Sequence, residues 1–325
     1  MHRIALIGAG RIGKIHARNI ALNPRTELAG VIDPVAPAAE ALAAEWRTPV
    51  LDLDQALADP SIAGVVIASS TDTHLDYSVR AAAAGKAVFC EKPIDQDLTR
   101  ARSARADLQD ARMLLAFNRR FDPNFQALKA RLDGGSIGGL ESLQITSNDP
   151  SPPPPSYVAV SGGLFKDMAI HDFDMARWLL GEEPVEVYAV GSCLVDLEIG
   201  RLGDVDTART VLKTASGKLC VIANSRRSGF GYDQRIEAYA SAGMVRADNV
   251  LESTVQTWSE GGAAADRFQN FFLDRYAEAY RREMDHFADI LDGATPSVGY
   301  ADGVAALALA EAAAESVRTG EVIRL

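Results

Sequence analysis

Residues 3–13 read RIALIGAGRIG, an apolar run followed at once by three glycines in the spacing GxGxxG. The apolar run predicts a buried strand, and the residues that follow have the composition of a helix. Gly8 permits a tight turn, Gly10 lets a ligand approach the backbone, and Gly13 lets the helix pack against the strand. The stretch predicts the first turn of a doubly wound α/β domain. A glycine turn that binds nothing is the alternative.

The first third of the chain alternates short β-rich runs with alanine-rich helical segments. The expected strands are residues 3–7, 28–32, 64–68, 87–90 and 113–116. Because strands joined by crossover helices pair in parallel, we expect a parallel sheet with helices on both faces. A ligand site in such a sheet lies beyond the carboxyl ends of its strands.

After residue 118 the pattern changes to that of a second, α+β domain. Helices are expected at residues 125–132, 167–180, 275–291 and 300–318, and strands at 140–147, 185–195, 208–214, 219–225, 235–240 and 253–258. Because the later strands follow one another without helices between them, they predict an open, mainly antiparallel sheet. The proline run at 152–155 predicts a stiff surface loop. The predicted domains are residues 1–118 and 119–325.

The overall composition excludes several classes of partner. The 325 residues include 33 Lys and Arg against 44 Asp and Glu, a formal net charge of −11, so neither nucleic acid nor a membrane is expected as a partner. No apolar run approaches the roughly 20 residues of a membrane span, and the first residues do not have the pattern of a signal peptide. Cys90, Cys193 and Cys220 show no paired spacing, which argues against a disulfide framework. A cytoplasmic location is expected.

Asp33 ends the second expected strand and indicates which dinucleotide the glycine loop binds. A carboxylate at this place accepts hydrogen bonds from the adenosine ribose hydroxyls. It also repels the 2′-phosphate of NADP, and Pro34 and Val35 supply no compensating cation. NAD is therefore the predicted cofactor, with its pyrophosphate at the amides and dipole of the following helix. The predicted contacts of the loop are Gly8, Gly10, Arg11, Ile12 and Gly13.

Two further segments carry ionisable side chains suited to alcohol oxidation. Glu91-Lys92-Pro93 follows an expected strand, so Lys92 projects from the rim where a nicotinamide would lie, although most lysines are solvated surface charges. Asp167 and His171 are four residues apart on an expected helix, which puts both side chains on one face. A histidine can take the hydroxyl proton as hydride leaves, and a carboxylate can stabilise its cation. A helix-start carboxylate beside a core histidine is the structural alternative.

A metal site is not predicted around the same histidine. His171, Asp172 and Asp174 are all able to bind a metal. Consecutive helical residues point in different directions, however, and no second histidine lies at a ligand spacing. Elsewhere, Arg119 can present donors to hydroxyl groups or phosphate, and Tyr232 either touches substrate or serves as a structural aromatic.

Four motifs together resemble those of the Gfo/Idh/MocA oxidoreductases. They are GAGRIG at residues 8–13, EKP at 91–93, FNRRFDP at 117–123 and SGGLFKDMAIHDFDMARW at 161–178. Within that family the match is closest to the inositol 2-dehydrogenases, and it covers essentially the whole chain. The resemblance implies an NAD-binding Rossmann domain and a substrate-binding α+β domain whose open sheet supports a homotetramer. It also implies NAD-dependent oxidation of a cyclic polyol, with myo-inositol oxidised to 2-keto-myo-inositol.

The resemblance further implies a catalytic set of Lys92, Asp167 and His171. In that set His171 takes the alcohol proton with help from Asp167, and Lys92 orients the hydroxyl and polarises the developing ketone. Asn148 stands where close relatives often carry a basic residue. The implied further cofactor contacts are Ser69, Thr71, His74, Glu91, Lys92 and Tyr276. The expected substrate contacts are Lys92, Arg119, Asn148, Asp167, His171 and Tyr232.

Two other functions remain open from the sequence. A dehydrogenase of scyllo-inositol or of a pyranose sugar would use the same three catalytic residues. A non-catalytic NAD-binding sensor would keep the glycine loop but could lose the proton-transfer residues, all of which are present here. Whether the enzyme acts on myo-inositol or on one of these alternative substrates, its partner is a small cyclic polyol or sugar.

Overall fold

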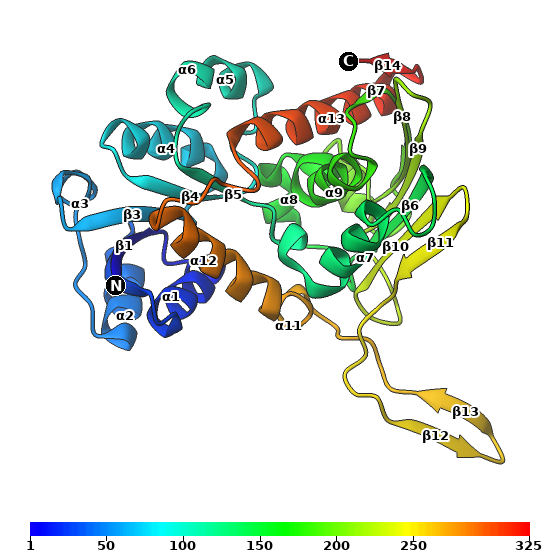
Figure 1. Ribbon diagram of the computed structural model, residues 1–325, viewed down its shortest axis with the longest axis horizontal. Coiled ribbons are helices and arrows are strands. Elements are labelled where there is room, and N and C mark those ends of the chain that lie inside the picture. Colours follow the sequence, from blue (N-terminus) through cyan, green and yellow to red (C-terminus); the bar gives the residue numbers. More distant parts are fainter. The chain divides into compact units, whose positions relative to one another are not determined.

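The chain forms two compact units in a computed structural model that describes residues 1–325. The first unit comprises Met1–Phe121 and Ala279–Leu307, and the second comprises Asp122–Glu278 and Ala308–Leu325. Each contains one large sheet (Figure 1). No helix has both the length and the apolar character needed to cross a membrane. The domain boundary at residues 118 and 119 stays a prediction, and the contact-based units differ from it in giving a late segment to the first unit.

The sheet of the first unit has five parallel strands in the order β2-β1-β3-β4-β5. The strands are β1 (His2–Ile7), β2 (Thr26–Ile32), β3 (Ile62–Ile67), β4 (Ala87–Glu91) and β5 (Met113–Ala116). All five coincide with predicted strands, and the doubly wound parallel fold is confirmed. The chain moves to one side from β1 to β2 and to the other side from β3 to β5. In sheets of this kind a ligand binds at the carboxyl ends of the strands on either side of the reversal, which are β1 and β3 here.

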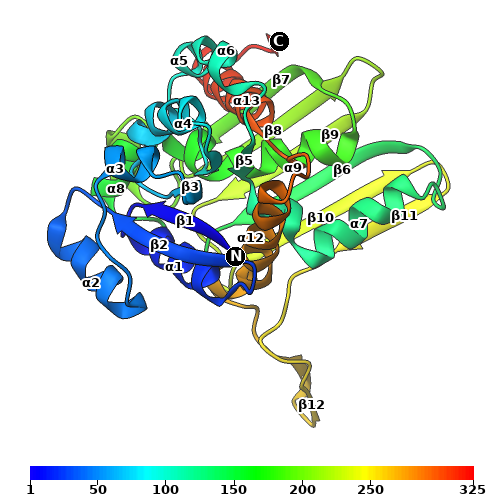
Figure 2. The ribbon, with the colours of Figure 1, turned by 60° about the vertical axis from the view of Figure 1, so that its left-hand side comes forward.

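Helices pack on both faces of this parallel sheet (Figures 1 and 2). They are α1 (Arg11–Leu22), α2 (Ala36–Trp46), α3 (Leu53–Ala58), α4 (His74–Ala83), α5 (Leu98–Ser103) and α6 (Arg105–Leu108), with short 3₁₀ turns η1 (Thr71–Thr73) and η2 (Asn118–Phe121). α1 contacts β1 and β2, whereas α4 contacts β3 and β4. The later part of α12 (Ala277–Leu291) joins them, because the ring of Phe287 meets that of Phe89 on β4 at 5.6 Å between centroids.

The second unit is built on a seven-stranded sheet in the order β11-β10-β6-β9-β8-β7-β14. Its strands are β6 (Leu140–Asn148), β7 (Pro184–Ser192), β8 (Thr207–Thr214), β9 (Leu219–Ser225), β10 (Asp233–Ala240), β11 (Gly243–Ala247) and β14 (Ile323–Arg324). Neighbours pair antiparallel except β6 and β9, which run parallel. The predicted α+β class with a mainly antiparallel sheet is therefore confirmed.

Helices cover one face of this second sheet and leave the other open (Figure 2). The unit holds α7 (Pro123–Asp133), α8 (Pro155–Ser161), a π turn η3 (Phe165–Ala169), α9 (Ile170–Leu180), α10 (Leu197–Arg201), α11 (Phe272–Arg275) and the end of α13 (Tyr300–Thr319). β8 shows the resulting alternation, because Thr210 and Leu212 are buried while Arg209 and Val211 are exposed. α9 packs on β6 and α7 on β11.

Two of the predicted strands differ in the structure. The expected strand at 185–195 ends at Ser192, because the Asp206 carboxylate accepts hydrogen bonds from the backbone amides of Leu194, Val195 and Asp196 at 2.7–2.9 Å and turns the chain out of the sheet. The expected strand at 253–258 is not part of the sheet.

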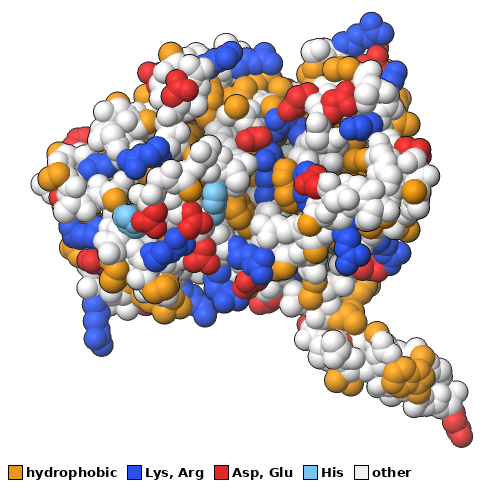
Figure 3. All heavy atoms as spheres, viewed as in Figure 1, with side chains coloured by type: hydrophobic (Ala, Val, Ile, Leu, Met, Phe, Trp, Pro, Cys, Tyr) orange, Lys and Arg blue, Asp and Glu red, His pale blue; other side chains and the backbone are white.

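A separate hairpin takes the place of that last strand. β12 (Gln256–Ser259) pairs only with β13 (Gly262–Ala265). All eight strand residues are exposed, and the Trp258 side chain is 72% exposed. Figure 3 shows hydrophobic atoms at the surface of this hairpin. Local β propensity predicted the strand correctly, but it does not determine which partner a strand pairs with.

Candidate active site

The glycine loop that follows β1 has the geometry that a dinucleotide requires. Gly8 has a φ of +107°, and a Cβ there would lie 2.3 Å from the carbonyl oxygen of Ala68 at the end of β3. A Cβ on Gly13 would lie 2.0 Å from the carbonyl oxygen of Gly8, so α1 can approach the turn only without a side chain. Gly10 is exposed and has no atom within 4 Å of its Cβ position. The turn is therefore closed on the protein side and open where a pyrophosphate would approach.

Asp33 lies beside this turn, just after β2. Its carboxylate accepts hydrogen bonds from the backbone amides of Ala9 at 2.7 Å and Val35 at 2.8 Å. Each carboxylate oxygen has a second lone pair, so a ribose hydroxyl can still donate to either one. Asp33 is half-buried next to the glycine loop, and the two residues after it carry no cation. These features fit NAD.

The loop after β3 carries Ser69, Thr71 and His74. Ser69 and Thr71 are half-buried, and the Ser69 hydroxyl hydrogen-bonds that of Thr73 at 2.7 Å. His74 is only 2% exposed, with Nδ1 2.8 Å from the carbonyl oxygen of Pro93 and Nε2 3.2 Å from that of Ser69. Burial lowers the pKa of His74, so the neutral ring donates one N–H, and the shorter distance favours Pro93. His74 thus ties the loop after β3 to the loop after β4, and its predicted cofactor contact stays a prediction.

The EKP segment lies at the carboxyl end of β4 in the same unit. Lys92 is half-buried and is joined to Pro93 by a cis peptide bond. Glu91 contacts Nε2 of the fully buried His16 at 2.7 Å. Beneath them the carboxyl group of Glu283 on α12 is completely buried, and burial together with the charge of Glu91 raises its pKa well above the usual range. Glu91, the residue before Lys92, is therefore held by a contact with the core.

Arg119 lies in η2, directly after β5. It is only 5% exposed, so any donor that it presents to a hydroxyl group comes from a largely buried guanidinium group. The neighbouring Arg120 forms an ion pair with Asp302 at 2.9 Å, so η2 is fixed within the first unit. The substrate contact of Arg119 stays a prediction.

Asp167 and His171 belong to the second unit, where the predicted single helix is interrupted. Asp167 lies in the π turn Phe165–Ala169, and His171 lies in the first turn of α9. The expectation of one uninterrupted α-helix from residue 167 is corrected accordingly. A spacing of four residues slightly exceeds one turn of an α-helix and falls slightly short of one π turn, so the side chains still start from the same side of the segment. Both residues are half-buried.

Two residues that the sequence did not assign hold the Asp167 carboxylate. The hydroxyl of Tyr157 on α8 donates to Oδ1 at 3.0 Å, and Nη1 of Arg226 lies 3.4 Å from Oδ2. Arg226 directly follows β9 and lies outside the four motifs that carry the resemblance to the family. Tyr157 follows the proline run, and no local pattern distinguishes it from any surface tyrosine. Long-range packing alone brings these groups to Asp167.

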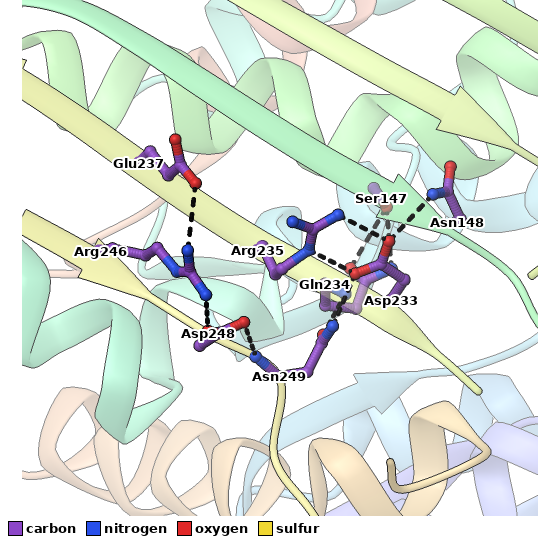
Figure 4. Close-up of polar contacts among 9 residues, drawn as sticks. All are labelled: Ser147, Asn148, Asp233, Gln234, Arg235, Glu237, Arg246, Asp248 and Asn249. Atoms are coloured by element: carbon purple, nitrogen blue, oxygen red, sulfur yellow. Dashed lines mark hydrogen bonds and ion pairs between the residues drawn. The ribbon is translucent and has the colours of Figure 1, made fainter. Parts of the chain in front are cut away.

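Asn148 ends β6 and is engaged with the neighbouring strand (Figure 4). Its Nδ2 donates to Asp233 Oδ2 at 3.2 Å, and the same buried carboxylate accepts from Arg235 at 2.7 Å and from Asn249 at 2.6 Å. A charged carboxylate with three donors is satisfied without a ligand. Asn148 is half-buried beside it, so its predicted substrate contact depends on its remaining amide atoms and stays a prediction.

Tyr232 and Tyr276 form an edge-to-face pair with ring centroids 6.0 Å apart. Tyr232 is 7% exposed and Tyr276 only 2%. The Tyr276 hydroxyl donates to Gln234 Oε1 at 3.1 Å, and the guanidinium of Arg275 lies 4.8 Å from the Tyr276 ring centroid. Both tyrosines therefore have packing roles, which was the alternative for Tyr232. Their contacts with substrate and nicotinamide stay predictions.

The ionisable residues do not form a metal cluster, and the cysteines are unpaired. No group of three or more His, Cys, Asp or Glu has a geometry that could hold a metal ion. Cys90, Cys193 and Cys220 are all free thiols. Burial raises the pKa of Cys90 and Cys220, which makes both poor nucleophiles.

The predicted site residues thus divide between the two units. The first unit brings the glycine loop together with the strand-end residues Asp33, Ser69, Thr71, His74, Glu91 and Lys92, and it also holds Arg119. The second unit holds Asn148, Asp167, His171, Tyr232 and Tyr276. One unit therefore has the features of a dinucleotide site, and the other holds the predicted proton-transfer pair.

Comparison with known proteins gives similarity over the whole chain. Residues 2–117 match the model of the oxidoreductase family with an NAD-binding Rossmann fold, and residues 125–246 match the GFO/IDH/MocA C-terminal domain. The chain is 48% identical to the inositol 2-dehydrogenase of Rhizobium meliloti, covering 97% of this chain and 96% of that protein. It is 44% identical to the myo-inositol 2-dehydrogenase of Thermotoga maritima, covering 99% and 98%.

A solved structure of a relative extends this similarity to three dimensions. The scyllo-inositol dehydrogenase of Lactobacillus casei, crystallised with NAD(H) and scyllo-inositol, superposes with a TM-score of 0.91 at 28% identity, covering 100% of this chain and 99% of that one. The match extends through both units, including the glycine loop and the segment that carries Asp167 and His171. The chain therefore belongs to the Gfo/Idh/MocA family of oxidoreductases, whose amino-terminal domain is an NAD-binding Rossmann fold.

Proposed function

We propose that this protein is an NAD-dependent dehydrogenase that oxidises a secondary alcohol of a cyclic polyol to a ketone, with myo-inositol as the substrate and 2-keto-myo-inositol as the product. The observation that carries the proposal is the 48% identity to an inositol 2-dehydrogenase over 97% of the chain. This identity spans both the cofactor unit and the unit that supplies Asp167 and His171.

The residues of the first unit fit the cofactor. The amides after Gly10 would bind the pyrophosphate, and Asp33 would accept hydrogen bonds from the adenosine ribose. Bound NAD supplies a nicotinamide ring that accepts the hydride from the carbinol carbon. The glycine loop binds and orients the cofactor, and the chain supplies the proton chemistry from other residues.

Three side chains have distinct roles in the proposed reaction. His171 accepts the hydroxyl proton as the carbonyl forms, because an imidazole can act as a general base at neutral pH. Asp167, held by Tyr157 and Arg226, stabilises the imidazolium that results. Lys92 orients the hydroxyl and stabilises negative charge on the oxygen as the proton leaves. Proton and hydride together account for the two hydrogens that the alcohol loses.

A second substrate has support of its own. The solved relative from Lactobacillus casei was crystallised with scyllo-inositol, and it is 28% identical to this chain over its whole length. A stereoisomer that differs in the orientation of one hydroxyl would use the same three residues. Oxidation of scyllo-inositol or of a pyranose sugar is therefore the alternative within the same reaction class.

The test is formation of NADH from NAD and a panel of polyols. Absorbance of the reduced cofactor should rise with myo-inositol at a higher kcat/KM than with scyllo-inositol, D-glucose or D-xylose. Preference for another ring would assign the enzyme to that substrate. Silence of the whole panel, with NAD binding intact by fluorescence titration, would instead favour the sensor. A His171→Ala variant serves as the chemical control, because His171 is not among the expected cofactor contacts, so the variant should keep NAD binding and lose turnover.

We further propose that the protein is a homotetramer of the cytoplasm. The open face of the second sheet exposes apolar side chains, among them Tyr188, Val190, Val211, Val221 and Tyr239. Such a face favours association between copies of the chain. The three free thiols fit a reducing compartment. Light scattering of the purified protein should give four times the 34.7 kDa mass of the chain, and Val211→Asp should lower it.

A further inference from the structure

Arg226 is a buried cation at the end of β9, in the second unit. Only 1% of its side chain is exposed, and its backbone amide donates to the carbonyl oxygen of Asp206 at 2.8 Å. Burying a guanidinium group is costly unless acidic groups compensate it. Its Nε and Nη2 have no hydrogen-bond partner. The compensation therefore comes from the carboxylates near it.

Two aspartates provide that compensation. Asp167 lies in the segment before His171, and Asp204 contacts the start of that segment. Nη1 of Arg226 lies 3.4 Å from Asp167 Oδ2, and Nη2 lies 3.7 Å from Asp204 Oδ2. One guanidinium group, that of Arg226, thus contacts the carboxylates of both Asp167 and Asp204. Because the same cation faces both carboxylates, a shift of one of them changes the electrostatic environment of the other.

Asp204 in turn holds the start of the segment. Both of its carboxylate oxygens accept from the backbone amide of Leu164 at 3.0 Å. A Cβ on Gly163, which has a φ of +81°, would lie 2.8 Å from Asp204 Oδ1. The glycine therefore lets this carboxylate approach the backbone from which the π turn begins. Arg226 and Asp204 together fix the two ends of residues 163–167.

The Asp167 carboxylate is oriented from two sides. Tyr157 donates to Oδ1 and Arg226 to Oδ2, so rotation of the carboxylate about its own axis would break one contact or the other. The two donors differ in exposure, because Tyr157 is 48% exposed whereas Arg226 is buried. The arginine is therefore the donor that solvent cannot replace.

We propose that Arg226 is a positioning residue for proton transfer, which acts through Asp167 by fixing the orientation and negative charge of that carboxylate and, through Asp204, the turn that leads to it. The inference rests on the proposed function for the role of Asp167. Arg226 itself is too deeply buried to touch substrate. Its contribution is to keep the partner of His171 in place between turnovers, since an oriented carboxylate stabilises the imidazolium better than a mobile one.

The experiment is a double-mutant cycle on the full-length protein. Arg226→Met, Asp167→Asn and the double variant are compared with the parent for kcat, for KM of the polyol and for NAD affinity. Arg226→Met should lower kcat about tenfold or more with NAD affinity within about twofold, and the double variant should be no slower than Asp167→Asn alone. Arg226→Lys, which keeps the charge, should recover part of the loss. Arg227→Met, at the exposed neighbouring residue, is the matched control and should behave as the parent.

Two results would overturn the inference. One is a folded Arg226→Met variant with the kcat of the parent. The other is a double variant whose loss equals the product of the two single losses, because Arg226 would then support activity only through general stability. If Arg226→Met does not fold, the same cycle is run with Arg226→Lys. A loss of kcat in the double variant that equals the product of the two single losses then overturns the inference equally.

Failure of the proposed function has a different signature. A parent protein that is silent with every polyol removes the enzymatic role whatever Arg226 does. In that case the same four proteins are compared by urea unfolding, and the crystal structure of Arg226→Met is examined at Asp167. A displaced carboxylate together with non-additive midpoints supports positioning of Asp167 by Arg226, whereas additive midpoints overturn it.

Discussion

The glycine loop at residues 8–13 and the segment at residues 163–171 both position functional groups, but they do so by different means. The loop depends on the absence of side chains, because a Cβ on Gly8 or Gly13 would collide with backbone at 2.0–2.3 Å. The later segment depends on side chains from other elements, because Tyr157 and Arg226 hold Asp167. The glycine spacing itself indicates close backbone approach, although the backbone that Gly8 meets belongs to Ala68 at the end of β3. Side-chain support comes from distant parts of the chain and cannot be inferred from spacing.

The difference predicts that the two regions respond differently to substitution. In the loop, a small change should affect cofactor affinity, and it should affect folding as well where a Cβ would meet backbone. In the later segment, a change should affect the chemical step while leaving cofactor binding and most of the stability intact, since half-buried Asp167 and His171 contribute little to the core. The following substitutions test this contrast.

The largest effect is expected from His171→Ala. Removing a general base costs on the order of 10²-fold or more in turnover, because the hydroxyl proton must then leave to water. NAD affinity should stay within about twofold, as measured by fluorescence titration, while kcat is measured from NADH absorbance. His2→Ala, at the far end of the chain in the first unit, is the control and should keep full turnover. A His171→Ala variant with normal kcat would place the base on another residue.

A paired comparison of Gly13→Ala and Gly10→Ala tests the loop. Alanine at Gly13 places a Cβ 2.0 Å from a carbonyl oxygen, so the variant should lose about 1–3 kcal/mol of folding free energy and also bind NAD less tightly. Gly10 has a φ of −72° and open space around its Cβ position, so alanine there should leave the folding free energy nearly unchanged. It should still weaken NAD binding about tenfold, because the methyl group occupies the approach of the pyrophosphate.

Urea unfolding and NAD titration of both glycine variants separate the two effects. Equal losses of stability in Gly10→Ala and Gly13→Ala would contradict the assignment of distinct roles. Unchanged NAD affinity in Gly10→Ala would mean that the cofactor does not approach the backbone there.

The same contrast explains how much could be predicted from the sequence. All five parallel strands and the glycine loop follow from local periodicity and spacing, and the structure confirms them. The strand at 256–259 was expected in the large sheet but pairs only with β13, because local propensity does not determine which partner a strand takes. The early end of β7 depends on Asp206, which lies more than ten residues later in the chain.

At the candidate site, residue types were easier to predict than their surroundings. Asp167 and His171 were singled out by their spacing, whereas the π turn between them leaves no pattern that a helical period detects. His74 shows another difficulty, because the resemblance implied only a cofactor contact, whereas no local motif indicates that its ring lies against two backbone carbonyl oxygens. Burial of a polar side chain is a property of the fold that a local motif does not encode.

A smaller effect is expected when the cofactor specificity is changed. Replacing Asp33 with serine and Pro34 with arginine removes the charge that repels a 2′-phosphate and adds one that attracts it. A charge-assisted hydrogen bond contributes about 1.5–3 kcal/mol, so the ratio of kcat/KM for NADP to that for NAD should rise about tenfold or more. The control is Asp52→Ser, which removes an aspartate near a helix start elsewhere in the unit. Unchanged selectivity in the double variant would show that Asp33 does not face the ribose.

The smallest effect on turnover is expected at Glu283, where the stability of the first unit depends on a contact that no local pattern shows. Burial, reinforced by the charge of Glu91, raises the pKa of Glu283 above the 4.5 of an exposed glutamate. The folded protein therefore keeps a proton that the unfolded chain releases. Stability from this group is complete below pH 4.5 and declines as the pH rises toward and through the raised pKa, by about 1.4 kcal/mol for each pH unit in that window.

Glu283→Gln should remove this decline, because the amide is uncharged in both states. Its free energy of unfolding, measured in urea at several pH values, should gain on that of the parent from pH 4.5 upward and should not gain below it. Glu260→Gln, at an exposed position, should follow the parent at every pH. Parallel curves for Glu283→Gln and the parent would mean that Glu283 ionises in the folded state as easily as in the unfolded one, which requires water or a cation beside its carboxyl group. The first unit would then resemble the second, because in both a buried ionisable side chain would depend on a polar or charged partner.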